Sequence, residues 1–251
     1  MNIEELKRNW HVLGKKDPMW AIITRADKKG NKWNAADFFK TGENKIAQLF
    51  EFLKSNGISV NTGSAMDFGC GIGRLTQALA SRFDYVAGVD IAESMIALAD
   101  KHNKHGDKCR YFLNTKDDLS LFADQSFDFI YTVIVLQHMR PEYAKSYIRE
   151  FVRLLKPKGV CIFQVPSRYV GNPVTPARPS FWRRRYNDVV RFAKANFKWL
   201  FRNRAYMEMY GIEKEEMMAY LESLGVKIAN VRPDDSPGAQ WESFQYTLIK
   251  N

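Results

Sequence analysis

One glycine-rich stretch, AMDFGCGIGRLTQALA at residues 65–80, constrains the fold of this chain more than any other feature. An apolar run precedes its three glycines, Gly69, Gly71 and Gly73, and a helical pattern follows them. Strand, glycine turn and helix N-terminus form a platform for a nucleoside cofactor, because glycine lets the backbone approach a ligand closely and leaves N–H groups free. The stretch therefore predicts an α/β domain with a nucleoside site after its first strand.

The glycine spacing separates the possible cofactors. A dinucleotide-binding loop needs its third glycine at position 74, where this chain has Arg74, and the terminal Lys-Ser/Thr pair of a phosphate-binding loop is absent. Asp67 stands two residues before the first glycine, and its carboxylate would repel a pyrophosphate but suit a cationic group. The loop thus predicts a cofactor that carries positive charge.

Short β-rich runs alternate with helical stretches over the next hundred residues. Strands are expected at 65–68, 85–90, 109–114, 127–135 and 159–165, and helices at 74–83, 93–106 (with Gly106 as C-cap) and 141–156. This alternation predicts a parallel sheet with helices on both faces. A last helix stopped by Gly225 precedes VKIANVR and WESFQYTLIK, two strand-like runs that predict an antiparallel hairpin.

Four segments in register resemble the class I S-adenosylmethionine-dependent methyltransferases: DFGCGIG, VAGVDIAESMI, SFDFIYTVIVLQHM and EFVRLLKPKGVCIFQVP. They cover residues 65–166, and the final hairpin is similar to the last two strands of that family. The resemblance implies a doubly wound, Rossmann-like α/β sheet of seven strands in the order 3-2-1-4-5-7-6, with strand 7 antiparallel. It also implies S-adenosylmethionine as cofactor, S-adenosylhomocysteine as product, and methyl transfer to a small or conjugated acceptor (sugar, nucleotide-linked or lipid-linked). Lys158 and Asn114 depart from the family pattern.

The resemblance also implies the residues of the cofactor site. It places Asp67 and Gly69 at the methionine end, Gly71 and Gly73 along the cofactor, and Asp90 on the ribose hydroxyls. Further implied positions are Ile91 and Met95 at the adenine, Asp118 and Leu119 at its amino group, Thr132 and Val133 beside the methyl donor, and Thr41 and Gly42, just before a helix, at the methionine end.

Acceptor-side candidates come from two other regions. His138 follows the fourth strand, where it could serve as a general base or could hydrogen-bond the backbone and shape the loop. The resemblance implies a helical prelude at 1–60, packed on the core over the cofactor mouth, before the main domain at 61–251. Within the prelude, Trp20 and Trp33 are candidates for walling the acceptor pocket, or are ordinary core aromatics.

The formal net charge of +10 is concentrated in one segment. Residues 168–204 hold ten Lys or Arg and a single acid, and they form most of an expected helical insertion at 167–210. Around 180–204 the pattern is an amphipathic basic helix, in which Arg183 and Arg184 are candidates for binding an anionic acceptor. A membrane-surface helix and a solvated charged face remain alternatives. Because the charge is local and no RNA-binding module is visible, nucleic acid is a less favoured partner.

Other features exclude several classes of site. The three cysteines are widely spaced, and His102 and His105 have no third ligand nearby, so neither a disulfide framework nor a metal site is expected. No apolar run approaches the ~20 residues that span a bilayer, and the N-terminus lacks the apolar core of a signal peptide, which favours a cytoplasmic protein. RNA methylation and cofactor binding without transfer remain alternative functions.

Overall fold

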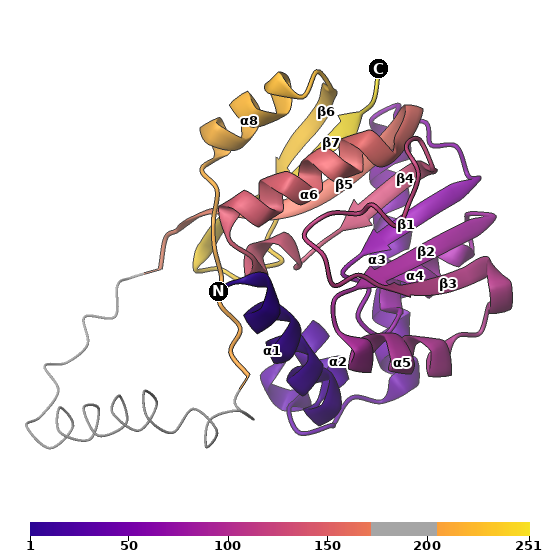
Figure 1. The fold of residues 1–251 in the computed structure, drawn as a ribbon, viewed down its shortest axis with the longest axis vertical. Coiled ribbons are helices and arrows are strands. Elements are labelled where there is room, and N and C mark those ends of the chain that lie inside the picture. Colours follow the sequence, from indigo (N-terminus) through magenta and orange to yellow (C-terminus); the bar gives the residue numbers. More distant parts are fainter. Residues whose placement is uncertain (172–204) are drawn as a thin grey trace, which may run out of the picture.

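Seven strands form one sheet in the order β3-β2-β1-β4-β5-β7-β6 in the computed structural model, which describes residues 1–171 and 205–251 (Figure 1). The strands are β1 (Ser64–Phe68), β2 (Tyr85–Asp90), β3 (Cys109–Leu113), β4 (Phe127–Thr132), β5 (Leu155–Tyr169), β6 (Lys227–Pro233) and β7 (Trp241–Ile249). Strands β1 to β5 pair in parallel, and β7 runs antiparallel to both β5 and β6. The predicted topology and terminal hairpin are confirmed.

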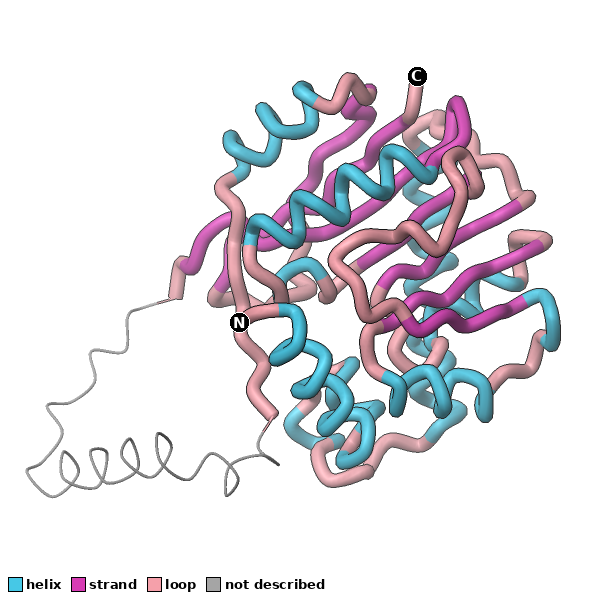
Figure 2. The backbone as a smooth tube through the Cα atoms, in the orientation of Figure 1, coloured by secondary structure: helices cyan, strands magenta, loops and turns pink. Residues whose placement is uncertain are grey.

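Helices cover both faces of this sheet. They are α1 (Ile3–Lys16), α2 (Pro18–Ile22), α3 (Ala35–Ser55), α4 (Arg74–Ala80), α5 (Glu93–His102), α6 (Pro141–Leu154) and α8 (Lys214–Ser223), with 3-10 turns η1 (Ala26–Lys28), η2 (Gly106–Lys108) and η3 (Leu136–His138). Helices α6 and α8 lie in front of the sheet in Figures 1 and 2, and α3 and α4 lie behind it. Helix α1 lies below the carboxyl ends of the parallel strands.

Each face of the sheet buries its own apolar cluster. Residues of α6 and α8, such as Phe151 and Leu221, pack with the front face. Residues of α3 and α4, such as Leu49 and Leu79, pack with the back face. Helix α3, within the first sixty residues that the sequence predicts to pack on the core, contributes directly to the back-face cluster.

Several expected boundaries are wrong: helix 74–83 ends at Ala80, helix 141–156 ends at Leu154, and the fifth strand, expected at 159–165, spans Leu155–Tyr169. Three further differences have a clear local cause. The helix predicted to end at Gly106 ends at His102, because Asn103 turns to extended backbone before the separate turn η2. The fourth strand stops at Thr132, and Ile134 then takes a left-handed φ of 61° that a strand cannot contain. Helix α3 begins well before Thr41, so this residue and Gly42 lie inside the helix and do not precede it.

Residues 172–204 lie outside the described part of the chain. The predicted amphipathic helix at 180–204, with Arg183 and Arg184, falls there, as does most of the insertion at 167–210. The ends of the insertion are described: residues 167–169 continue β5, and the chain from Ala205 leads back toward α8. Among the helices of residues 1–171 and 205–251, none is long and apolar enough to cross a membrane.

Candidate functional site

A cavity opens at the carboxyl ends of β1, β2 and β4, the place where open α/β sheets bind ligands. It contains about 910 Å³ of space free of protein atoms, which includes open solvent at its mouth. One group of its lining residues comes from the ends of β1, β2 and β3 and the loops and helix that follow: Gly69, Gly71, Asp90, Ile91, Met95 and Asn114. A second group, here called the apolar wall, comes from α1, α2 and the η3–α6 region: Ile3, Leu6, Trp10, Ile22, Met139 and Tyr147.

The glycine loop needs its glycines for both conformation and space. Gly69, Gly71 and Gly73 have φ of 75°, 54° and 84°, in the left-handed region that favours glycine. A Cβ atom added at Gly69 would lie 2.3 Å from Cγ2 of Val135, and one added at Gly71 would lie 2.5 Å from Cδ1 of Ile22. The loop therefore packs directly against the residues that follow β4 and against α2.

Asp90 ends β2 beside this loop. Its carboxylate accepts hydrogen bonds from the Gly71 amide (2.9 Å) and the Ala92 amide (2.8 Å). Desolvation raises the pKa of Asp90 from 3.8 to about 6, and the backbone donors partly oppose that rise. At neutral pH the group is an ionised acceptor at the cavity wall, suited to a pair of hydroxyl groups.

Asp67 lies below the cavity and is not among the residues that line it. Its carboxylate is buried in β1 and accepts a hydrogen bond from the Thr76 hydroxyl at 2.7 Å. Burial raises the pKa of Asp67 to about 6, while Thr76 and the Arg74 guanidinium act in the opposite sense. In this structure Asp67 supports the start of α4.

Arg74 lines the cavity. In the sequence it is notable only because it stands where a dinucleotide-binding loop would have its third glycine. The side chain is 7% exposed, and its Nη1 makes a long, 3.4 Å contact with the Thr41 hydroxyl. Its Nε has no hydrogen-bond partner among the described residues. Gly42 lets α3 approach this residue, since a Cβ atom there would lie 2.3 Å from the Arg74 carbonyl oxygen. A buried cation with an unused donor at a cavity wall fits a carboxylate ligand.

His138 also lines the cavity, at the end of η3. The Nδ1 atom lies 2.9 Å from the Glu208 carbonyl oxygen, and Nε2 lies 3.4 Å from Nε2 of Gln137. The Trp10 ring packs edge-on against the imidazole, with 5.2 Å between ring centroids. Burial lowers the pKa of His138, so the ring is neutral at pH 7.

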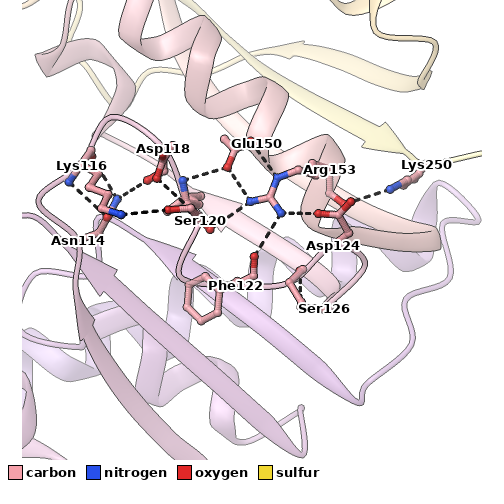
Figure 3. A network of polar contacts seen from close by, with 12 residues as sticks. Asn114, Lys116, Asp118, Ser120, Phe122, Asp124, Ser126, Glu150, Arg153 and Lys250 are labelled. Carbon is pink, nitrogen blue, oxygen red and sulfur yellow. Dashed lines mark hydrogen bonds and ion pairs between the residues drawn. The ribbon is translucent and has the colours of Figure 1, made fainter.

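The loop after β3 differs from the sequence-based placement. A network centred on Arg153 holds it, because the guanidinium bonds Glu150, Asp124 and the carbonyl oxygens of Leu119 and Phe122 (Figure 3). Leu119 is fully buried, and the Asp118 carboxylate accepts a hydrogen bond from the Ser120 amide. Neither predicted residue lines the cavity.

Asn114 lines the cavity in their place. Its Nδ2 donates to the Asp118 carbonyl oxygen at 2.8 Å, and its Oδ1 lies 3.4 Å from the Lys116 amide. The Asn114 side chain thus ties the start of the loop together directly beside the cavity.

The remaining predicted positions divide into two sets. Asp90, Ile91, Met95, Val133, Gly69, Gly71 and His138 line the cavity; Gly73, Thr132, Thr41, Gly42, Trp20 and Trp33 do not. The Trp20 indole donates to the Arg25 carbonyl, and Trp33 packs on Phe38 away from the cavity. Trp10 is the tryptophan of the apolar wall, and its place in an amphipathic helix was the only signal that could have indicated it. Among the described residues, no group of His, Cys, Asp and Glu is arranged to hold a metal ion.

Comparison with known proteins supports a methyltransferase domain, as the sequence resemblance implies. Residues 66–163 match the family model described as a methyltransferase domain. The chain is 34% identical over 122 residues to thiocyanate methyltransferase 1 of Arabidopsis thaliana, an alignment that covers 46% of this chain and 52% of that protein. It is 31% identical over 121 residues to the ubiquinone biosynthesis O-methyltransferase of Pseudomonas savastanoi pv. phaseolicola, covering 46% and 51%. The chain thus spans about half the length of these relatives.

A solved structure shares the fold over the whole chain. The magnesium protoporphyrin IX methyltransferase of Synechocystis PCC 6803, with bound S-adenosylhomocysteine, superposes with a TM-score of 0.63, and the match covers 100% of both chains. The two sequences are 16% identical, so this likeness establishes the fold and leaves the acceptor open.

Proposed function

Because residues 66–163 form a class I S-adenosylmethionine-dependent methyltransferase domain, we propose that this chain transfers the cofactor's methyl group to a small molecule bound in the same cavity. S-adenosylmethionine is the cofactor of the domain. The observation that carries the proposal is the Asp90 carboxylate, held 2.9 Å from the Gly71 amide at the cavity wall.

Residues on the strand side of the cavity would hold the cofactor. Asp90 is an ionised acceptor for the two ribose hydroxyls, and Ile91 and Met95 offer apolar surface to the adenine. Arg74, with its unused Nε donor, would bind the methionine carboxylate. The glycines of the loop carry no side chain of their own, so a ligand would approach their backbone closely beside Ile22 and Val135. The described residues therefore fit the group.

The apolar wall supports an acceptor whose nucleophilic atom is attached to an uncharged, largely apolar part of the molecule. Ile3, Leu6 and Met139 expose hydrocarbon to the cavity. The Tyr147 hydroxyl donates its hydrogen bond to the Lys116 carbonyl oxygen at 2.6 Å. Bound cofactor supplies an electrophilic methyl group; the wall excludes water and aligns the acceptor with it, and alignment alone provides much of the rate in such a transfer. The basic residues that the sequence has at 180–204 would bind an anionic portion of the acceptor, either in a free metabolite or at a lipid surface.

A labelling experiment tests the proposal. Protein is incubated with methyl-tritiated S-adenosylmethionine and, separately, with a desalted small-molecule extract, total RNA and denatured protein. We expect label in the small-molecule fraction and not in RNA or protein. Label confined to RNA would support the RNA methyltransferase alternative, and saturable cofactor binding without label in any fraction would support a binding protein that lacks transfer activity; either result would contradict the proposal.

A further inference from the structure

The chain that returns from the insertion contacts His138, a residue that lines the cavity, before it reaches α8, although none of residues 205–212 lines the cavity itself. This return segment, residues 205–212, lies beside the N-terminal end of α1 in Figure 1. Backbone bonds tie it to the main domain, from the Tyr210 amide to the Gln137 carbonyl (2.8 Å) and from the Ile212 amide to the Pro166 carbonyl (2.9 Å). Met207 packs on the apolar cluster that holds Ala21 and Met95. The segment therefore connects η3 with the helices that cover the cavity.

His138 makes one of the bonds to this segment, and the amino group of Met1 makes two others, to the Glu208 carboxylate (3.2 Å) and the Tyr210 hydroxyl (2.8 Å). The Glu208 carbonyl oxygen, 2.9 Å from Nδ1, can only accept, so Nδ1 carries the proton. A neutral imidazole then has its free lone pair on Nε2. The ring is 6% exposed, and burial holds it in the neutral form.

A chain of amide contacts, from Ile134 through Gln164 to Gln137, determines which group faces Nε2 of His138. The Ile134 amide donates to Oε1 of Gln164 (3.0 Å), which orients the Gln164 side chain so that its Nε2 donates to Ser243 (2.8 Å) and to Oε1 of Gln137 (3.4 Å). The Gln137 amide nitrogen is thereby turned toward Nε2 of His138, at 3.4 Å. Both ring nitrogens of His138 are engaged by the protein itself.

We propose that His138 is a positioning residue, fixed at the cavity wall by its bond to the return segment behind it, and that it does not take a proton from the acceptor. The acceptor part of this inference rests on the proposed function; the hydrogen-bonding part does not. The close fit of the segment supports it, since a Cβ atom at Gly211 would lie 2.3 Å from the Ser167 carbonyl oxygen. A segment seated so closely has little freedom once its side-chain anchor is in place.

A matched pair of variants separates the two ring nitrogens. The side-chain nitrogen of asparagine is attached at the same carbon position as Nδ1, and that of glutamine is at the position of Nε2. His138→Asn therefore keeps a donor for Glu208, whereas His138→Gln loses it. We expect amide hydrogen exchange at residues 208–210 to rise about 2–10-fold in His138→Gln, the effect of losing one hydrogen bond, and to return toward wild type in His138→Asn. Equal exchange in all three proteins would overturn the proposal.

Two further readouts address the proton. Long-range ¹H–¹⁵N spectra of the imidazole should show a neutral ring protonated at Nδ1; a ring protonated at Nε2 instead would overturn the assignment. With the small-molecule extract as probe, methyl incorporation by His138→Gln should recover as the concentration of the extract is raised. The reason is that a displaced side chain at the cavity wall weakens acceptor binding. A loss of about 10²-fold that persists at saturation would identify a general base. If wild type incorporates no label, the proposed function fails, while exchange and spectra still decide the role of His138.

Discussion

The Asp90 carboxylate and the Gly71 amide lie 2.9 Å apart, which joins the end of β2 to the glycine loop after β1. This bond spans nineteen residues of sequence and places an ionised acceptor directly beside the glycine loop. Because Gly71 has φ of 54°, the loop reaches Asp90 only with glycine or a strained residue at this position. The end of β2 and the loop after β1 therefore form this part of the site together.

The pH dependence of cofactor binding should reveal the ionisation of Asp90. Its folded pKa of about 6 lies above the ordinary value of 3.8, so the carboxyl takes up a proton as pH falls through 6 and then offers fewer acceptor sites to the ribose. We expect the affinity for S-adenosylhomocysteine to be constant between pH 7 and 8 and to fall by up to tenfold per pH unit below 6.

Asp90→Asn is the control for this measurement. It should bind more weakly at pH 7.5 and lose most of the slope below pH 6, and what slope remains would report Asp67, whose pKa is also about 6. A variant with the wild-type slope would show that Asp90 does not contact the cofactor.

Arg74→Gln should distinguish the contributions that the amino-acid end and the adenosine end of the cofactor make to binding. Loss of a charged hydrogen bond costs about 1.5–3 kcal/mol, so S-adenosylhomocysteine should bind at least tenfold more weakly. The ligand 5′-methylthioadenosine lacks the amino and carboxyl groups, and its affinity should change less than twofold. Equal weakening of both ligands would mean that Arg74 only supports the fold, through its contacts with Thr41 and Gly42.

Gly69→Ala should destabilise the protein more than Gly106→Ala. Both glycines have positive φ, so both substitutions carry the conformational cost of an L residue in that region. Only Gly69 faces a neighbour, since Cγ2 of Val135 would lie 2.3 Å from the new Cβ, whereas nothing lies within 4 Å at Gly106. We expect the free energy of unfolding in urea to fall by about 1–3 kcal/mol more for Gly69→Ala. Equal losses would refute the close approach of Val135.

The arginines at 183–185 give a prediction that comes from sequence alone. They stand at the N-terminal end of the predicted basic helix, where positive charge opposes the helix dipole, so an anionic partner is a reason for them. Replacing all three with glutamine should raise the apparent KM for the acceptor and leave cofactor affinity unchanged. Added salt should weaken wild type more than the variant, because exposed charges are screened over about 8–10 Å at 0.1–0.15 M. Unchanged acceptor kinetics and unchanged binding to anionic liposomes would mean that these arginines are solvated surface.

Local sequence patterns predicted the sheet better than the cavity. The run YVAGVD has the bounds of β2, and the proline at position 141 begins α6, because these signals depend on neighbouring residues. The apolar wall depends on tertiary packing. The amphipathic pattern of α1 indicates that Leu6 is buried but not what it faces, and the place of Trp10 in that helix does not show that its ring reaches the cavity.

The loop after β3 shows the same limit. The sequence offers Asp118 as an acid in the expected stretch, yet the loop takes its register from Arg153 and Glu150, about thirty residues further along the chain (Figure 3). Those contacts bury Leu119 and leave Asn114 at the cavity. A loop held from a distant helix cannot be placed from its own residues.

Calorimetric titration of the full chain tests the central claim most directly. S-adenosylhomocysteine should bind saturably at one site per chain, NAD should give no binding heat, and Asp90→Asn should weaken the binding by about 1.5–3 kcal/mol. Saturable binding of NAD with no response to S-adenosylhomocysteine, or an unchanged dissociation constant in a folded Asp90→Asn variant, would contradict the account.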